Sequence, residues 1–435
     1  MNVRTYLFAL VDGGGTVPPE LGAAQRLVER GHQVTVLGED SMASDVAAAG
    51  ATFVPWTEAP NRASRRPEDD PYRDWECTNP LELFSRLLEF QFAGPAPAYA
   101  RDMADAIDTV KPDLAVCSFF AIGAMVAAQA RGVPFDVPFP NTYLLPVDGM
   151  PPVGLGLRPA HGPVTRFRDR IVRSLTLRQW NKGVPALNSV RASYGLPPVQ
   201  EFFDQVHLAR KHLVLTSAEF DFPAQMPLHV RYVGAVLDDP AWTSATPWTP
   251  PAGDGPLILV ALSSTFQDQT SCLQRVIDGL AGLPVRGYVT TGPAVDPGML
   301  TAADNVTVVE AAPHSQVLPH ADVVITHAGH GTVVRALAAG VPVLALPHGR
   351  DQADNAVRIS TRGAGITLSR KAKPGKIAAA TQGLLDDPGY ADAAGRLGAI
   401  IRRDAEAGRL IAELEEIEPV RHGANGDDLI SPTPS

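Results

Sequence analysis

The strongest constraint on the fold is a segment near the C-terminus in which two apolar runs flank a helical stretch. The runs at 321–326 and 341–346 are short and consist largely of valine, isoleucine, leucine and alanine, which is typical of buried parallel strands. The stretch at 333–339 has a helical pattern, and Gly340 ends it. Strand, helix and strand in this order predict a βαβ unit, and open sheets built from such units bind ligands at the carboxyl ends of their strands.

The turn between the first of these strands and the helix has the residues of an anion-binding loop. Glycines allow the backbone to approach a ligand closely, and a helix start presents unpaired N–H groups and the positive end of its dipole. We therefore predict that the turn at 327–332 binds a diphosphate through His327, Gly329, His330, Gly331 and Thr332. The alternatives are a structural role for His327 and, for His330, positioning of the backbone.

The loop after the second strand, at 347–352, ends in Asp351 and Gln352. A carboxylate accepts hydrogen bonds and an amide both accepts and donates them, so this pair is suited to sugar hydroxyls. We therefore expect these two residues to bind a sugar, with a plain polar turn as the alternative.

The rest of the chain alternates strands and helices in the same way, which predicts an α/β fold with two domains in its 435 residues. Both domains are expected to be Rossmann-like, with doubly wound parallel sheets. The expected division is an N-terminal domain at 1–237, a Pro-rich linker at 238–256, a C-terminal domain with terminal helices at 257–418 and a disordered polar tail at 419–435.

The overall composition argues against several classes of protein. The formal net charge is −10, from 37 basic and 47 acidic residues, which is unfavourable for a sequence-independent nucleic-acid binder. No apolar run reaches the ~18 residues of a membrane span, and the N-terminus lacks a signal peptide's apolar core, so we expect a cytoplasmic protein. The 3 cysteines are odd in number and lack metal spacing, so neither a disulfide framework nor a zinc site is supported. No cofactor and no metal are expected.

Three motifs in the C-terminal half resemble the nucleotide-sugar-dependent glycosyltransferases of the macrolide and UDP-glucuronosyl/glucosyl superfamily. They are the turn at 327–332, the stretch at 336–342, and the loop at 347–352 followed by Asn355. The opening of the chain is similar to the same family through a strand, a Gly-rich loop, Pro19 and the segment at 30–36. The resemblance implies the GT-B fold, in which two Rossmann-like domains face each other across a cleft. The C-terminal domain would hold the nucleotide sugar and the N-terminal domain the acceptor.

The resemblance also implies roles for individual residues. It assigns phosphate contacts to Ser264, His327, Gly331 and Thr332, sugar contacts to Asp351 and Gln352, and positions flanking the nucleotide base to Ala312 and His314. For His314, a loop position without ligand contact is the alternative.

Four positions depart from the family pattern. Thr16 occupies the place where many members have a histidine that acts as the base for the acceptor hydroxyl, and Ser118 replaces the aspartate that orients this histidine. A threonine hydroxyl does not titrate near neutral pH, so it cannot itself serve as the base. Arg335 stands where the family has a ribose-binding glutamate, and Ala311 where an aromatic residue often stacks on the base. Recognition of the base, UDP or dTDP, is therefore left open.

Another residue would then have to accept the proton of the acceptor. Asp12 is the first candidate because it ends the first strand, at the crevice where ligands bind, although a loop-stabilising carboxylate is the alternative. Asp136 is a weaker candidate within a short strand, and His161 lies in a loop that would have to reach the acceptor. An acidic acceptor would need no strong base.

Together these patterns predict an inverting glycosyltransferase that moves a sugar from a UDP- or dTDP-sugar to a small, hydrophobic, natural-product-like acceptor. Long Pro- and Arg-containing loops at 59–76 and 150–170 are expected to form the acceptor rim. A monomer or a homodimer is expected. The alternatives are a catalytically impaired homologue that only binds a nucleotide sugar, and a nucleotide-sugar epimerase with the same fold.

Overall fold

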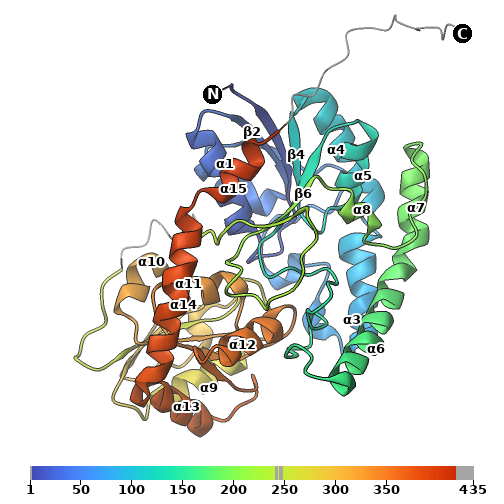
Figure 1. Cartoon of the computed structure of the whole chain (residues 1–435). Coiled ribbons are helices and arrows are strands. Elements are labelled where there is room, and N and C mark those ends of the chain that lie inside the picture. The colour runs from blue at the N-terminus through green and yellow to red at the C-terminus, as the bar shows by residue number, and fades with distance from the viewer. Residues whose placement is uncertain (1, 241–242, 244–247, 418–435) are drawn as a thin grey trace, which may run out of the picture.

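The computed structural model describes residues 2–240, 243 and 248–417, which form two parallel β-sheets with helices packed on them (Figure 1). The N-terminal sheet has 7 strands in the order β3-β2-β1-β4-β5-β6-β7. These strands are β1 (Thr5–Ala9), β2 (Gln33–Gly38), β3 (Thr52–Pro55), β4 (Leu114–Cys117), β5 (Phe135–Phe139), β6 (Lys211–Val214) and β7 (Val230–Tyr232).

The C-terminal sheet has 6 strands in the order β10-β9-β8-β11-β12-β13. These strands are β8 (Leu257–Ala261), β9 (Arg286–Thr290), β10 (Val306–Val309), β11 (Val323–Thr326), β12 (Val343–Ala345) and β13 (Gly365–Thr367). In this sheet β8 and β11 are the central pair, so the predicted βαβ unit of β11 and β12 extends from the middle of the sheet.

The strand sequences explain why both sheets are parallel and buried. Successive residues of β1 point to opposite faces, so that Leu7 and Ala9 enter one apolar cluster and Tyr6 and Phe8 enter another. Because both faces are covered, β1 and β8 are apolar almost throughout instead of alternating with polar residues. The predicted α/β fold with two Rossmann-like sheets is confirmed.

Helices cover the N-terminal sheet and the rim of its domain. They are α1 (Val17–Glu29), α2 (Ala43–Ala48), α3 (Pro80–Arg86), α4 (Ala96–Val110), α5 (Ile122–Ala130), α6 (Pro163–Trp180), α7 (Val184–Ser193) and α8 (Asp204–His207). The C-terminal half contributes α9 (Thr270–Leu280), α10 (His314–Val317), α11 (His330–Ala338), α12 (Gln352–Thr361), α13 (Pro374–Asp386), α14 (Pro388–Glu406) and α15 (Arg409–Glu415).

The last two helices connect the domains. Helix α14 packs on α11 of the C-terminal domain, and α15 then lies beside α1 of the N-terminal domain (Figure 1). The Tyr6 hydroxyl donates to the carbonyl of Leu414 at 3.4 Å, and Arg30 pairs with Glu415 at 2.6 Å. The apolar side of α15 joins the core of the N-terminal sheet, whereas the predicted division places this helix in the C-terminal domain.

The predicted tail at 419–435 and parts of the predicted linker lie outside the described residues. Within the described part of the chain, every helix is too short or too polar to traverse a lipid bilayer.

Candidate active site

A cavity of about 800 Å³ lies where the two domains face each other. Its walls come from segments that follow β1, β4 and β5 on one side and β8, β11 and β12 on the other. These are carboxyl ends of parallel strands, where open α/β sheets bind ligands. The predicted site residues that line it are Thr16, Ser264, Ala312, His314, His327, Gly329, His330, Gly331, Thr332, Arg335, Asp351 and Gln352. Asp12, Ser118 and His161 are not among its lining residues.

The turn at 327–332 joins the end of β11 to the first turn of α11. Helix α11 begins at His330, with Gly329 as its N-cap, so the second half of the predicted turn is already helical. The first N–H groups of a helix have no intrahelical partner, which leaves those of Gly331 and Thr332 available at the cavity. A β-carbon on Gly329 would lie 2.4 Å from the Nε2 atom of His327, so the close packing of this ring requires glycine.

His327 is a neutral hydrogen-bonding group in this environment. Its side chain is largely buried, with 8% of the residue exposed, and the hydroxyl of Thr326 lies 3.2 Å from Nδ1. Burial lowers the pKa of His327 to about 3, and the nearby His348 and Arg350 act in the same direction. The neutral ring carries one N–H and no formal charge of its own, and the Ala261 backbone is one of its hydrogen-bond partners.

His330 supports the turn from behind. Its ring packs edge-on against Phe220 at 5.4 Å between centroids, and its Nδ1 lies 3.4 Å from the side-chain oxygen of Asn355. The Asn355 amide also donates to the carbonyl of Ala328 at 3.0 Å. These contacts correspond to the backbone-positioning role that was the alternative for His330.

Asp351 and Gln352 differ in how much of their side chain remains for a ligand. The Gln352 oxygen accepts from the backbone N–H groups of His348 and Gly349 at 2.7 and 3.1 Å, and its nitrogen donates to Gln267 at 2.8 Å. Gln352 therefore holds the loop together and has one N–H left for a sugar. Burial raises the pKa of Asp351 to about 6, although Asn355 donates to its carboxylate at 2.9 Å.

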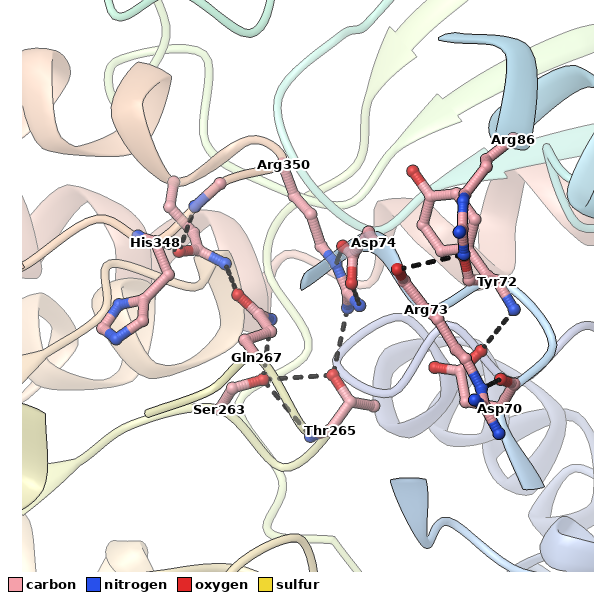
Figure 2. A network of polar contacts seen from close by, with 12 residues as sticks. Asp70, Tyr72, Arg73, Asp74, Arg86, Ser263, Thr265, Gln267, His348 and Arg350 are labelled. Carbon is pink, nitrogen blue, oxygen red and sulfur yellow. Dashed lines mark hydrogen bonds and ion pairs between the residues drawn. The ribbon is translucent and has the colours of Figure 1, made fainter. Parts of the chain in front are cut away.

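The same loop reaches across the cleft through Arg350. Figure 2 shows the Arg350 guanidinium between Asp74 of the N-terminal domain, at 2.7 Å, and the hydroxyl of Thr265, at 3.0 Å. Thr265 in turn lies 3.1 Å from the hydroxyl of Ser263. This network fixes the donor-side loop that carries Ser264 against the predicted acceptor rim.

The expected nucleotide-base end of the cavity contains Ala312, His314 and Arg335. Burial lowers the pKa of His314 to about 3, and its Nε2 lies 3.2 Å from the hydroxyl of Thr290. Arg335 donates to the carbonyl of Gly331 at 3.0 Å and pairs with Asp239 at 3.5 Å. A carboxylate is thus present beside Arg335, although it comes from the predicted linker and not from α11.

The structure argues against Asp12 as the base. Its carboxylate is buried and pairs with Arg65 at 2.7 Å, while the Ser41 hydroxyl and the Gly14 N–H donate to it at 3.0 and 2.9 Å. Burial is the largest single effect and raises the pKa of Asp12, but the charges of Arg65 and Arg62 and the hydrogen bonds from Arg65 and Gly14 together lower the pKa overall. Asp12 therefore stabilises the loop, which was the alternative role.

The two weaker base candidates are also badly placed. His161 is exposed in the loop before α6. Asp136 is buried within β5 and pairs with Arg210 at 2.6 Å, away from the cavity lining. Neither residue is among those that line the cavity.

The N-terminal half of the cavity is largely aromatic. The ring of Trp180 lies 5.0 Å from that of Phe92 and 5.6 Å from that of Phe84, and Phe120 lies 5.4 Å from Phe92. The predicted rim loops contribute as well, for example through Trp75 and Leu155. This half is suited to a flat, apolar molecule.

Sequence reasoning missed three charged residues of this region: Arg65, Asp74 and Glu20. Arg65 and Asp74 lie in the loop at 59–76, which was predicted to form the acceptor rim without a role for any single residue. Glu20 carried a usable signal, because it follows Thr16 by one helical turn and therefore shares its side of α1.

Comparison with known proteins agrees with this architecture. Residues 288–416 match the family described as "Erythromycin biosynthesis protein CIII-like, C-terminal domain". The 4'-demethylrebeccamycin synthase of Lentzea aerocolonigenes is 28% identical over 403 residues, which cover 90% of this chain and 94% of that protein. The oleandomycin glycosyltransferase of Streptomyces antibioticus is 28% identical over 421 residues, which cover 94% of this chain and 89% of that protein.

Solved structures with the same fold include several glycosyltransferases. The glycosyltransferase of kitacinnamycin superposes with a TM-score of 0.74 at 24% identity, covering 95% of this chain and 99% of that one. The calicheamicin glycosyltransferase CalG4 superposes with a TM-score of 0.72 at 24% identity, covering 96% of this chain and 100% of that one. The glycosyltransferase VinC, solved in complex with dTDP, superposes with a TM-score of 0.64 at 18% identity, covering 94% of this chain and 98% of that one.

The two facing sheets and these relationships define the chain as a glycosyltransferase with the GT-B fold, which confirms the resemblance seen in the sequence. More narrowly, residues 288–416 match the EryCIII-like C-terminal domain family, and the similar proteins include the oleandomycin glycosyltransferase.

Proposed function

We propose that the protein transfers a sugar from a nucleoside-diphosphate sugar to a small, flat, apolar acceptor, with inversion at the anomeric carbon. The observation that carries this proposal is the turn at 327–332, whose first-turn N–H groups and neutral His327 line a cavity shared by both domains. The opposite half of that cavity is apolar and aromatic.

The donor would bind with its diphosphate against the first turn of α11. The N–H groups of Gly331 and Thr332, the His327 ring and Ser264 on the facing loop are the groups that would contact it. These donors are fixed before the reaction, so they stabilise the charge that develops on the leaving diphosphate. We expect no metal to be required for this step.

The sugar would lie between the diphosphate and the acceptor, near Asp351. The attacking atom of the acceptor forms a bond to the anomeric carbon while the bond from that carbon to the diphosphate oxygen breaks. The electron pair of the broken bond leaves with the nucleoside diphosphate, and the proton of the acceptor passes to a base. Attack opposite the leaving group gives inversion.

The nucleotide is the first property to test, and dTDP is favoured because VinC was solved with it. We expect dTDP or UDP to raise the melting temperature (Tm) of the purified protein, while GDP does not. A ligand that binds only the native state adds about 2.7 kcal/mol at roughly 100 times its Kd. A panel in which none of the three nucleotides raises Tm would contradict the proposed donor site.

Product analysis then separates the alternatives. Incubation with the sugar nucleotide alone should leave the donor sugar unchanged, whereas an epimerase would convert it. A homologue that only binds would show nucleotide protection but transfer sugar to no member of a panel of aromatic hydroxyl compounds.

A further inference from the structure

A small side pocket opens beside the acceptor half of the main cavity. It is lined by the polar residues Thr16, Glu20, Ser118 and Asn141 together with aromatic rings. Of its polar residues, Thr16 and Asn141 also line the main cavity, so both lie at the boundary between the two spaces, together with the apolar residues Phe119, Phe120, Pro140 and Leu144.

Glu20 is the unusual residue of this side pocket. It is 1% exposed, and among the described residues no side chain forms a hydrogen bond of good geometry with its carboxyl oxygens, although the Ser118 hydroxyl is close enough to interact with them. The buried side-chain oxygens of Thr16 and Asn141 are also without a partner in the described part of the chain. Burying an ionised carboxylate with so few hydrogen bonds is unfavourable, so the ionised form of Glu20 is destabilised here.

Thr16 and Glu20 both line the side pocket, and of the two only Thr16 also lines the main cavity. Thr16 is the N-cap of α1, and Glu20 follows it by one turn, with the Glu20 N–H directed to the Thr16 carbonyl at 3.4 Å. A β-carbon on Gly13 would lie 2.8 Å from the Thr16 hydroxyl oxygen, so glycine leaves the space that this hydroxyl occupies. Ser118 follows β4 and approaches the carboxyl group from the neighbouring strand.

The surroundings of Glu20 also favour proton uptake. Burial raises the pKa of Glu20 well above its ordinary value, the Ser118 hydroxyl offsets this in part, and the like charge of Asp12 raises it further. Asp12 itself stays ionised in its pair with Arg65. A carboxylate is an effective base when its pKa has moved towards the working pH.

We propose that Glu20 is the terminal proton acceptor of the transfer reaction and that the Thr16 hydroxyl relays the proton to it. This inference rests on the proposed function, because it assigns the base for that reaction. As the acceptor attacks the anomeric carbon, its proton passes to the Thr16 oxygen, and the Thr16 proton passes to the Glu20 carboxylate. Glu20 becomes neutral and later returns the proton to solvent by the same route.

The test compares two acceptors of nearly identical shape, 2-naphthol and naphthalene-2-thiol, with dTDP-glucose or UDP-glucose as donor at about pH 8. A thiol ionises more readily than a phenol, so the thiol needs little help from a base. We expect Glu20→Gln to lower kcat/KM for 2-naphthol by about 10²- to 10⁴-fold, and for the thiol by less than about tenfold. The acidic limb of the pH profile for 2-naphthol should disappear, and the Kd for the nucleotide should stay within about twofold.

Thr16 provides a second variant that leaves Glu20 in place. Thr16→Val removes the relay hydroxyl at constant shape and should reproduce the selective loss with 2-naphthol, whereas Thr16→Ser should retain most of the activity. If Glu20→Gln does not fold, the Thr16 pair decides the question.

The outcomes separate this proposal from the proposed function. If the parent is active but Glu20→Gln and Thr16→Val lose kcat/KM equally for both acceptors, or do not lose it at all, the proposed role of Glu20 is wrong. The glycosyltransferase assignment would stand in that case. A parent that transfers sugar to neither acceptor would contradict the proposed function as well.

Discussion

His327, His314 and Asp351 share one property at the scale of the residue: burial is the largest cause of each shifted pKa. The two histidines are neutral at pH 7, and the pKa of Asp351 rises to about 6, so its negative charge is weakened in slightly acidic solution. The donor half of the cavity therefore binds an anion mainly through oriented N–H groups, with little formal positive charge from histidine.

Replacing His327 should therefore weaken catalysis without disturbing the fold. We expect His327→Ala to lower kcat by about 10²- to 10³-fold, the usual effect of removing one donor to a developing anion. Steady-state rates with the best acceptor measure this effect, and Tm provides the control for folding. Transfer at the parental rate would remove His327 from the donor site.

Glu20 should reduce the stability of the folded protein at neutral pH. In the folded state the pKa of Glu20 is raised well above the ordinary value of 4.5. At a pH between 4.5 and this raised pKa, the folded protein keeps a proton on Glu20 that the unfolded chain has lost. Ionisation of Glu20 therefore opposes folding increasingly as the pH rises from 4.5 towards the raised pKa.

Calorimetry of Glu20→Gln tests whether the ionisation of Glu20 lowers the stability of the folded protein. The Tm of the variant should exceed that of the parent by more at about pH 8 than at about pH 5, because glutamine cannot ionise. Glu29→Gln is the matched control, since Glu29 is an exposed glutamate on the same helix and should show no such gain. A variant that is less stable than the parent at pH 8 would mean that Glu20 has a stabilising partner.

The contrast between Asp12 and Glu20 shows which residue roles the sequence could not predict. Both carboxylates stand near the end of β1 and the start of α1. What separates them is Arg65, which is 53 residues from Asp12 in sequence and neutralises Asp12 but not Glu20. Such long-range pairing leaves no local pattern.

At the scale of the element, the unit of β11 and α11 could be predicted because its signals are local. Apolar strand residues, glycines at the turn and a helix ended before Gly340 lie within one short segment. The helix start was placed too late, at 333 instead of His330, because the turn residues His330 to Thr332 lack apolar periodicity. Because the helix begins at His330, its first N–H groups lie within the predicted turn at 327–332.

The close packing of this turn provides a prediction for Gly329. An alanine β-carbon there would lie 2.4 Å from the His327 ring, so Gly329→Ala must displace the ring. We expect the variant to lose most of its nucleotide-induced rise in Tm. Gly331→Ala is a control for the stability of the protein without nucleotide, because the nearest atom to a β-carbon there is 3.7 Å away. Undiminished protection in Gly329→Ala would show that the ring position does not matter for binding.

At the scale of the whole molecule, contacts between residues far apart in sequence hold the two domains together around the cavity. Arg350 pairs with Asp74, Arg358 pairs with Asp221 at 2.7 Å, and the Asp354 carboxylate accepts from the N–H of Gly156 at 2.9 Å. Two Rossmann-like sheets could be predicted from strand and helix periodicity. These distant pairs and apolar packing determine how the two sheets face each other and why α15 returns to the first sheet. Strand and helix periodicity does not encode them.

A crystal structure of the protein with dTDP or UDP tests most directly whether the turn at 327–332 binds the diphosphate. We expect diphosphate oxygens within hydrogen-bond distance of the Gly331 and Thr332 N–H groups and of the His327 ring. A nucleotide whose diphosphate lies instead against the glycine loop at 13–15, with the turn at 327–332 free of ligand, would contradict this expectation.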